Sequence, residues 1–434
     1  MFAVNAIIDF LRLKAISVSV VLLCLSMTTI PVKAANGEGQ RAIVKVVAIL
    51  NADELGESFR YPSFLAYDQD MDEIYVTVGG KGKIIVYNSN FFPTDSLGPG
   101  RGADAARGIY LNNDGWIYVC QGETDTRPGQ VTVFNPAFFP EQEIIFDSIP
   151  GVEKFLPRDL VIGLTGNIYV VGQGNRGLMV LDKEGKFSHW LQPQDQIFDM
   201  EAAASAQEER EQNELELTDI GMITREKTEI QDETLDMSEF LPQELIPGSI
   251  VDRLKERKSS LGPVIVADVA RDSEGHLYVL SEETGKVYVY SPFEEFLFSF
   301  GEKGGSPGKM SRPKSLVVDE KKKAVYVVDY MRHTILIFDQ GGKFMYEFGG
   351  FGTGPGWFQY PTGLTLTRDG LLAVADLFNH RVQVLDVQFE YKFPLFQSPE
   401  TGKPEIRDDI QPEQSTPPDS GTDDGGDIFQ PAPL

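Results

Sequence analysis

The chain has 434 residues and a formal net charge of −26 at pH 7, with 65 acidic side chains against 39 Lys and Arg. This charge argues against a nucleic-acid ligand, because an acidic surface repels phosphates. Of the 2 cysteines, Cys24 lies in a segment that we expect to be removed, which leaves Cys120. No intramolecular disulfide is therefore expected in the mature chain, and the fold must close without one.

The N-terminus has the features of a secretory leader. Arg12 and Lys14 precede an apolar stretch over residues 15–30, and the cleavage pattern Val32-Lys33-Ala34 follows it. These features predict a bacterial signal peptide over residues 1–34, which places the mature protein in the periplasm or outside the cell. An uncleaved anchor is the alternative, but the stretch is short for a bilayer span. We expect no membrane span in the mature chain.

A unit of about 45 to 50 residues recurs six times along the rest of the chain. Each unit combines alternating apolar residues with hairpin turns such as Asp369-Gly370. One such unit is a small four-stranded sheet that cannot bury its own faces, so consecutive units must pack together. The second strands of the units are expected near Ile74, Ile117, Ile168, Leu277, Val325 and Leu372.

The two ends of the repeat region are expected to meet. The last unit has three good strands, but the chain after Tyr391 turns polar and contains Pro394. Its missing fourth strand is predicted to be the apolar segment of residues 42–49, since pairing there removes two exposed sheet edges. The prediction is an all-β, six-bladed propeller over residues 41–392, closed by an N-terminal strand. Separate β-sandwich domains are the alternative, and they would need irregular strand spacing.

The repeats resemble NHL repeats, which are named for a triplet matched here by Asn379-His380-Arg381. The similarity is close in the last two units and looser in the first four. The resemblance implies the propeller fold, but it says little about activity, since NHL propellers include binding modules and a minority of enzymes. In bacterial envelopes such propellers often accompany larger secreted or redox assemblies.

Two segments depart from the repeat. Residues 193–262 form a densely acidic insert that we expect to be partly helical, with helices over residues 199–211 and 249–258. Residues 393–434 form an acidic tail rich in Pro and Gly, which we expect to be disordered. The insert is expected to leave the propeller near its basic residues, either as a lid over them or as a solvated spacer.

We find no catalytic constellation in the sequence. His333 and His380 share the entry to a third strand, while His276 lies in a hairpin turn and His189 in a fourth strand. The four histidines are therefore not expected to converge on the channel, and a histidine zinc site of the kind found in NHL lyases is not expected. A lactonase-type calcium site would need carboxylates on innermost strands, where Asp159 and Asp268 are the main ones. The acidic run from Asp68 to Asp72 lacks the Gly and the final acid of an EF-hand loop. We therefore expect no cofactor and no bound metal.

One arrangement of basic residues stands out. Arg107, Arg158 and Lys314 follow the same repeat position, at the start of an innermost strand, so they should meet at one end of the channel. Arg176, Arg332 and Arg381 lie in loops that open on the same face. These six cations form either a partner-binding surface or ordinary salt bridges, for instance of Arg158 with Asp159 or Asp182.

The leading hypothesis is a non-catalytic, exported propeller that binds a protein or peptide through its loop face, as part of an envelope or extracellular complex. A lactonase or lyase with a channel metal is the first alternative. A carbohydrate-binding module is the second, because aromatic residues stack on sugars, although their positions favour packing between blades. These aromatic candidates are Trp116, Trp190, Trp357, Phe358 and Tyr360.

Overall fold

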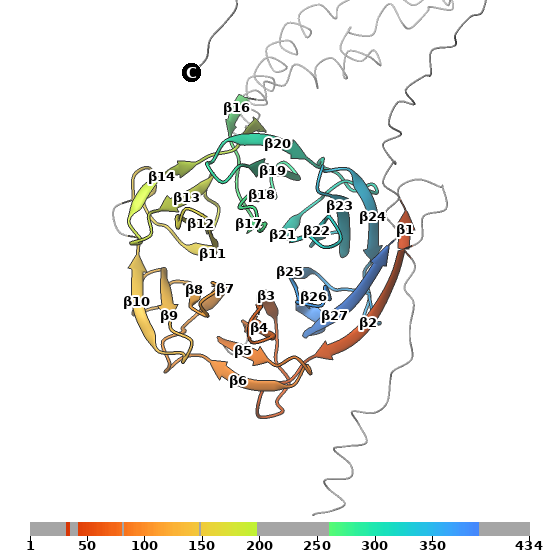
Figure 1. Ribbon diagram of the computed structural model, residues 1–434, viewed down its shortest axis with the longest axis horizontal. Coiled ribbons are helices and arrows are strands. Elements are labelled where there is room, and N and C mark those ends of the chain that lie inside the picture. The colour runs from red at the N-terminus through yellow and green to blue at the C-terminus, as the bar shows by residue number, and fades with distance from the viewer. Residues whose placement is uncertain (1–31, 35–41, 80–81, 147–148, 198–259, 390–434) are drawn as a thin grey trace, which may run out of the picture. The chain divides into compact units, whose positions relative to one another are not determined.

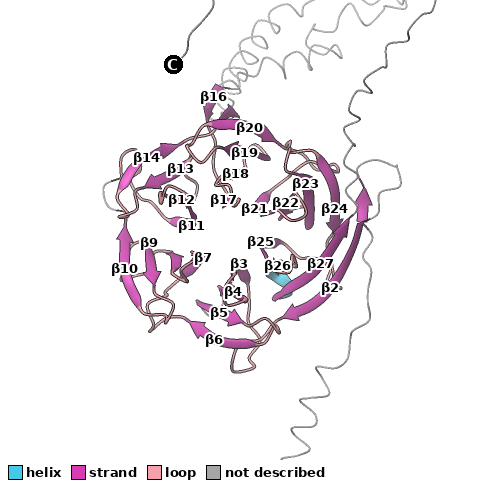
Figure 2. Ribbon diagram, in the orientation of Figure 1, coloured by secondary structure: helices cyan, strands magenta, loops and turns pink. Residues whose placement is uncertain are grey.

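The computed structural model describes residues 32–34, 42–79, 82–146, 149–197 and 260–389. Six antiparallel sheets stand around a central axis, with their first strands innermost (Figures 1 and 2). The predicted six-bladed propeller is therefore confirmed. The predicted tail and the predicted helices of the insert lie outside the described residues. No helix in the described part of the chain is long and apolar enough to cross a membrane.

Each blade has four strands that follow one another in the chain, except in the last. Blades 1 to 3 consist of β3 (Pro62–Asp68), β4 (Glu73–Val78), β5 (Lys83–Tyr87) and β6 (Pro93–Leu97); β7 (Ala106–Leu111), β8 (Ile117–Gln121), β9 (Gln130–Phe134) and β10 (Pro140–Ile145); and β11 (Pro157–Ile162), β12 (Ile168–Gly172), β13 (Leu178–Leu181) and β14 (Phe187–Leu191). Blades 4 to 6 consist of β17 (Asp268–Arg271), β18 (Leu277–Ser281), β19 (Lys286–Tyr290) and β20 (Phe296–Phe300); β21 (Pro313–Asp319), β22 (Ala324–Asp329), β23 (Thr334–Asp339) and β24 (Phe344–Gly349); and β25 (Pro361–Leu366), β26 (Leu372–Asp376), β27 (Arg381–Phe389) and β2 (Ala42–Leu50).

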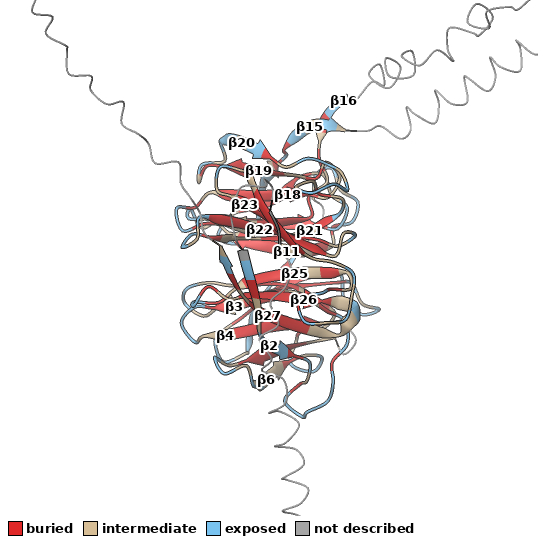
Figure 3. Ribbon diagram, turned by 90° about the vertical axis from the view of Figure 1, so that its right-hand side faces the viewer, coloured by how far each residue is buried: buried red, intermediate tan, exposed pale blue. Residues whose placement is uncertain are grey.

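The core lies between the blades, not within them. The second and third strands are buried on both faces, as in β4, β19 and β22, whereas the outer strand β20 is largely exposed (Figure 3). Blades 6 and 1, for example, share a cluster in which Val76 lies among Ala373 and Val384. Continuous β-branched runs fit this setting because each side of the sheet meets another sheet.

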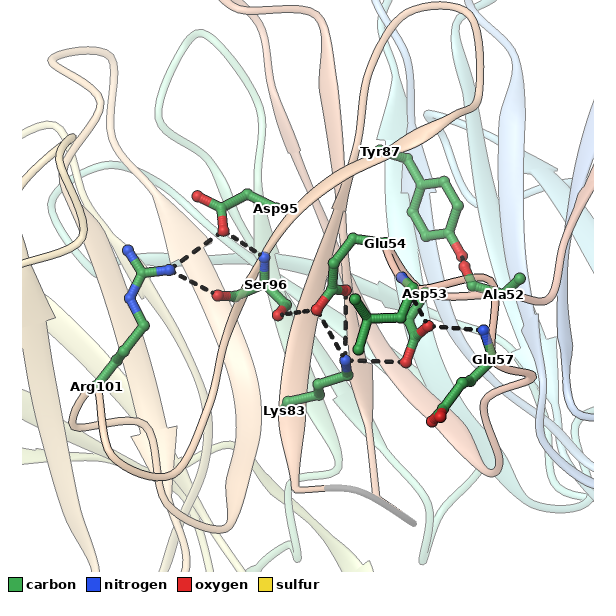
Figure 4. A network of polar contacts seen from close by, with 10 residues as sticks. Ala52, Asp53, Glu54, Glu57, Lys83, Tyr87, Asp95, Ser96 and Arg101 are labelled. Carbon is green, nitrogen blue, oxygen red and sulfur yellow. Dashed lines mark hydrogen bonds and ion pairs between the residues drawn. The ribbon is translucent and has the colours of Figure 1, made fainter. Parts of the chain in front are cut away.

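The N-terminal strand closes the ring as predicted. β2 pairs antiparallel with β27, with Val44 opposite Val387 and Leu50 opposite Val382. Directly after β2, the buried carboxylate of Asp53 accepts hydrogen bonds from the Glu57 backbone N–H at 2.9 Å and from Lys83 Nζ at 3.0 Å (Figure 4). Lys83 belongs to blade 1, so this ion pair fastens the closing strand to the following blade.

Two additional pairings were not predicted. The short strand β1 (Val32–Ala34) pairs with β24 and gives blade 5 a fifth strand, although these residues fall within the expected leader. The described ends of the acidic insert, β15 (Gln194–Ile197) and β16 (Ser260–Pro263), form a two-stranded ribbon between blades 3 and 4. Asp195 in this ribbon accepts hydrogen bonds from Lys286 at 2.8 Å and Tyr288 at 2.6 Å. Residues 198–259 of the insert lie outside the described part.

Two substitutions on neighbouring positions of β2 test the closure. Val44 is fully buried, while Ile43 is 41% exposed. We expect Val44→Asp to lower the free energy of unfolding by about 3 kcal/mol or more, because it buries an unpaired charge in the closing seam. Ile43→Asp should cost about 1 kcal/mol or less, because its side chain faces solvent. Chemical denaturation of the two variants checks this, and equal losses would contradict the closure.

Candidate functional site at the channel mouth

The site is built by a shared irregularity of the innermost strands. In five blades the register of the first strand shifts within its first residues, for example between Pro157 and Asp159 and between Pro313 and Ser315. Such a bulge re-aims side chains at the end of a strand. The residues just after the start of these strands, which include Arg107, Arg158 and Lys314, line one cavity at the end of the channel.

We call this cavity, of about 830 Å³, the channel mouth. It is lined by five cationic side chains and two carboxylates, so its lining carries an excess of three positive charges in a chain of net charge −26. Low-dielectric walls around like charges concentrate their field and attract oppositely charged groups. The charged lining residues are Arg107, Arg158, Lys303, Arg312, Lys314, Glu282 and Glu283.

Arg107 and Arg158 have no carboxylate partner within 4.0 Å among the described residues. Arg107 donates to the neutral side-chain oxygen of Gln173 at 2.7 Å. The guanidinium lies against Gly122, where an added Cβ would sit 3.0 Å from its Nε. Arg158 reaches across the channel, and its guanidinium carbon lies 5.9 Å from the centre of the Phe64 ring on blade 1. Neither Asp159 nor Asp182 forms an ion pair with Arg158 within 4.0 Å, although the positive charge of Arg158 opposes the rise in the pKa of Asp159.

Lys314 is instead held by an acid. Its Nζ donates to Glu282, which also accepts a hydrogen bond from Arg312 Nε at 2.6 Å. Burial lowers the pKa of Lys314 in spite of this contact, with Arg158 adding to the effect. Burial likewise lowers the pKa of Lys303. One carboxylate is thus shared by two cations, and the ammonium groups are partly desolvated.

The other three predicted cations lie outside the cavity lining and serve internal contacts. Arg176 binds Glu283 at 3.0 Å. Arg332 pairs with the buried carboxylate of Glu347 at 2.8 Å. Arg381 donates to Asp376 and to the backbone oxygens of Gly354 and Trp357. The structure therefore brings together Arg107, Arg158 and Lys314, and it does not add Arg176, Arg332 and Arg381 to them.

Two carboxyl groups lie next to the mouth on adjacent blades. Asp159 and Asp268 follow one another around the channel, and Asp268 accepts a hydrogen bond from the Leu316 N–H at 2.7 Å. Burial raises the pKa of Asp159 well above its ordinary value, and the negative charge of Asp268 raises it further. Burial also raises the pKa of Asp268. Because two adjacent buried carboxyl groups ionise together only at a high cost, we expect this pair to hold one proton between them.

The metal-ligating residue types do not converge. In the described ranges, no group of three or more His, Cys, Asp or Glu side chains is placed to hold a metal ion. His333 and His380 instead accept the backbone N–H groups of Tyr360 and Tyr61 through Nδ1, at 2.9 and 3.3 Å. These hydrogen bonds fix the links from blade 5 to blade 6 and from blade 6 to blade 1. Cys120 is fully buried, and burial raises the pKa of its thiol.

An aromatic row borders the mouth on blades 5, 6 and 1. Lys314 Nζ lies 5.8 Å from the Tyr330 ring centre, and Tyr330 lies 4.8 Å from Tyr360. Phe378, in the 3-10 helix η3 (Leu377–Asn379), lies 5.2 Å from Tyr360 and 5.9 Å from Tyr61. Tyr61 and Phe378 are 40% and 44% exposed. We define these four rings, Tyr330, Tyr360, Phe378 and Tyr61, as the aromatic row.

Sequence reasoning picked out only one member of this row. Tyr360 was among the sugar-binding candidates, but Tyr61, Tyr330 and Phe378 were missed. The repeated Tyr-Pro pair at 61–62 and 360–361 is the signal that points to two of them. The other aromatic candidates are scattered: Trp116 and Trp190 pack into the cluster between blades 2 and 3, and Phe358 is buried.

Comparisons with known proteins agree on the architecture. Residues 321–393 match a family described as 6-bladed beta-propeller. NHL repeat-containing protein 2 of Bos taurus is 31% identical over 116 residues, which are 24% of this chain and 16% of that protein. The aligned segment thus spans a small part of the relative. The resemblance to NHL-type six-bladed propellers is confirmed.

Solved structures with a similar fold have low sequence identity to this chain. A Staphylococcus aureus virginiamycin B lyase with quinupristin is 11% identical, with 83% of this chain and 96% of that chain covered and a TM-score of 0.44. An auxiliary nutrient binding protein from Bacteroides ovatus is also 11% identical, with 81% and 78% covered and a TM-score of 0.48. Neither likeness bears on function.

The shared proton of Asp159 and Asp268 leads to a prediction. The pKa of Asp159 is raised above the value of about 3.9 that it has in an unfolded chain. The folded state therefore binds a proton that the unfolded state releases. The raised pKa of Asp159 therefore contributes most to stability at pH values below the unfolded pKa. This contribution is lost as the pH rises through the folded pKa.

Asp159→Asn should weaken that pH dependence. Its amide donates to Asp268 without titrating, so we expect the free energy of unfolding at pH 7 to rise by about 1 kcal/mol. Asp268→Ala is the contrast, because it leaves the Leu316 N–H without its acceptor and should cost about 2 kcal/mol. Denaturant unfolding from pH 4 to 8 measures both, and a destabilised Asp159→Asn would refute the shared proton.

Proposed function

We propose that this protein is a non-catalytic binding platform that holds a protein or peptide partner at the channel mouth. The observation that carries the proposal is the pair Arg107 and Arg158, two cations at the mouth that make no ion pair within 4.0 Å with any described carboxylate. Guanidinium groups without such an ion pair, in a partly enclosed cavity, favour an anionic group from another molecule. The predicted leader supports an exported protein that works in the periplasm or outside the cell.

The rigid frame suits this role. The blades present loops at each end of a closed ring, and loops on a fixed scaffold carry binding in many folds. The two carboxylates that line the mouth are already held by cations, Glu282 by Arg312 and Lys314 and Glu283 by Arg176. The carboxyls beside the mouth, Asp159 and Asp268, are engaged with each other and with backbone N–H groups. Their engagement leaves the basic residues as the groups that face an incoming partner.

Capture of the partner from the native source tests the proposal. The full chain is compared with a variant in which Arg107, Arg158 and Lys314 are changed to Ser, after crosslinking and quantitative recovery. The matched control changes Lys183, Lys186 and Lys343 to Ser, which removes the same charge from turns at the opposite ends of the strands. We expect the mouth variant to lose at least about 90% of the recovered partner and the control to lose little.

Three measurements complete this test. Thermal melting of both variants confirms that they are folded. A partner recovered equally by the wild type and the mouth variant would contradict binding at the mouth. Stoichiometric zinc or calcium in the purified full chain would favour a channel enzyme of the lactonase or lyase class instead.

A further inference from the structure

We infer that the channel mouth and the aromatic row together recognise an acidic peptide segment in which carboxylates stand beside aromatic or large apolar side chains. This inference rests on the proposed function and narrows the partner to one chemistry. It joins two surfaces that meet through the contact of Lys314 with the Tyr330 ring.

The carboxylate end of the site is set by Arg107 and Arg158. They start equivalent strands of neighbouring blades, β7 and β11, and both line the same cavity. A guanidinium group binds a carboxylate through two parallel hydrogen bonds, which is stronger than the single bond that Arg107 makes to Gln173. An arriving carboxylate can therefore replace the amide oxygen of Gln173. Lys314 lies on the opposite side of the mouth, where it donates to Glu282. Burial lowers the pKa of Lys314, and a second anion beside Glu282 would favour its charged form.

The apolar end of the site is the aromatic row. Tyr61 and Phe378 expose about two fifths of their surfaces, at 40% and 44%. The backbone oxygen of Tyr61 accepts a hydrogen bond from the N–H of Gly79, which lines the mouth, at 3.1 Å. Large rings with exposed faces and little side-chain entropy are favoured as anchors in protein interfaces. The row therefore continues the mouth outward over blades 5, 6 and 1.

The geometry favours a peptide over other anions. A cavity of about 830 Å³ is larger than one free carboxylate or phosphate requires, and the row extends the surface beyond the cavity. Phe378 is inclined by 84° to Tyr61 and by 74° to Tyr360, so these rings form a ridged apolar surface and not a flat platform for a sugar. The net charge of −26 disfavours nucleic acid.

Three labelled heptapeptides test the inference on the full chain. The first is Gly-Glu-Phe-Glu-Phe-Glu-Gly, the second replaces each Glu by Gln, and the third replaces each Phe by Ser. Binding is followed by fluorescence anisotropy at low and moderate salt. We expect the first peptide to bind and to weaken as salt is added, and the Gln peptide to bind at least about tenfold more weakly.

Variants assign the two ends of the site. Arg107→Gln combined with Arg158→Gln should weaken the first peptide at least about tenfold, while Lys183→Gln combined with Lys343→Gln should leave it unchanged. Tyr61→Ser combined with Phe378→Ser should weaken the Phe-containing peptide at least about threefold but leave the Ser-containing peptide unaffected. This selective loss separates contact with the peptide from damage to the fold.

Several results would overturn the inference. Equal binding of the Glu and Gln peptides, or binding unaffected by the arginine substitutions, would exclude carboxylate recognition. If inorganic phosphate displaces the labelled peptide as effectively as unlabelled peptide does, the mouth is a site for small anions. If polygalacturonate binds while the peptides do not, the mouth is a saccharide site. If native partner capture still depends on the mouth while no acidic peptide binds, the inference fails and the proposed function stands.

Discussion

A propeller blade has two apolar faces and no way to cover them alone, and this constraint shapes the rest of the molecule. The middle strands of every blade are buried on both sides, so each sheet is stable only between two others. An open row of blades would leave a bare face at each end. The pairing of β2 with β27 removes both ends at once, because the last blade is completed by the first strand of the propeller. No disulfide takes part within the described ranges, where Cys120 is a free, buried thiol.

The same closed ring creates the channel mouth. Neighbouring blades approach so closely near the channel that side chains of one blade donate hydrogen bonds to the backbone of the next: Thr77 of β4 donates to the Arg107 oxygen and Thr362 of β25 to the Ser63 oxygen, both at 2.9 Å. At Gly108 an added Cβ would lie 2.5 Å from the backbone oxygen of Arg158. These contacts fix the strands, so the bulged residues above them hold their side chains in one arrangement. Preorganised cations lose little entropy when a partner binds.

Much of this architecture could be predicted from the repeats because a fixed spacing determines fixed neighbours. The convergence of Arg107, Arg158 and Lys314 follows from their shared repeat position, although they are distant in sequence. The repeats could not show which cations are neutralised, because the acids that hold Arg176 and Arg332, Glu283 and Glu347, belong to different strands and loops. The β15–β16 ribbon was also missed, since its short strands lack an alternating apolar pattern and are held by contacts with blade 4, such as that of Asp195 with Lys286.

The position of β2 has a consequence for how the chain folds. Residues 42–50 leave the ribosome before any blade exists, whereas their partner β27 is the last strand of the propeller in chain order. The pairing of β2 with β27 is therefore the strand pairing with the longest sequence separation in the ring. Such pairings form slowly because the intervening chain must be ordered first. Until then the exposed edge of β27 can accept the same strand from another copy, which is the route to strand exchange between molecules. The Asp53–Lys83 ion pair, formed within a local stretch of chain, holds β2 beside blade 1 during that interval.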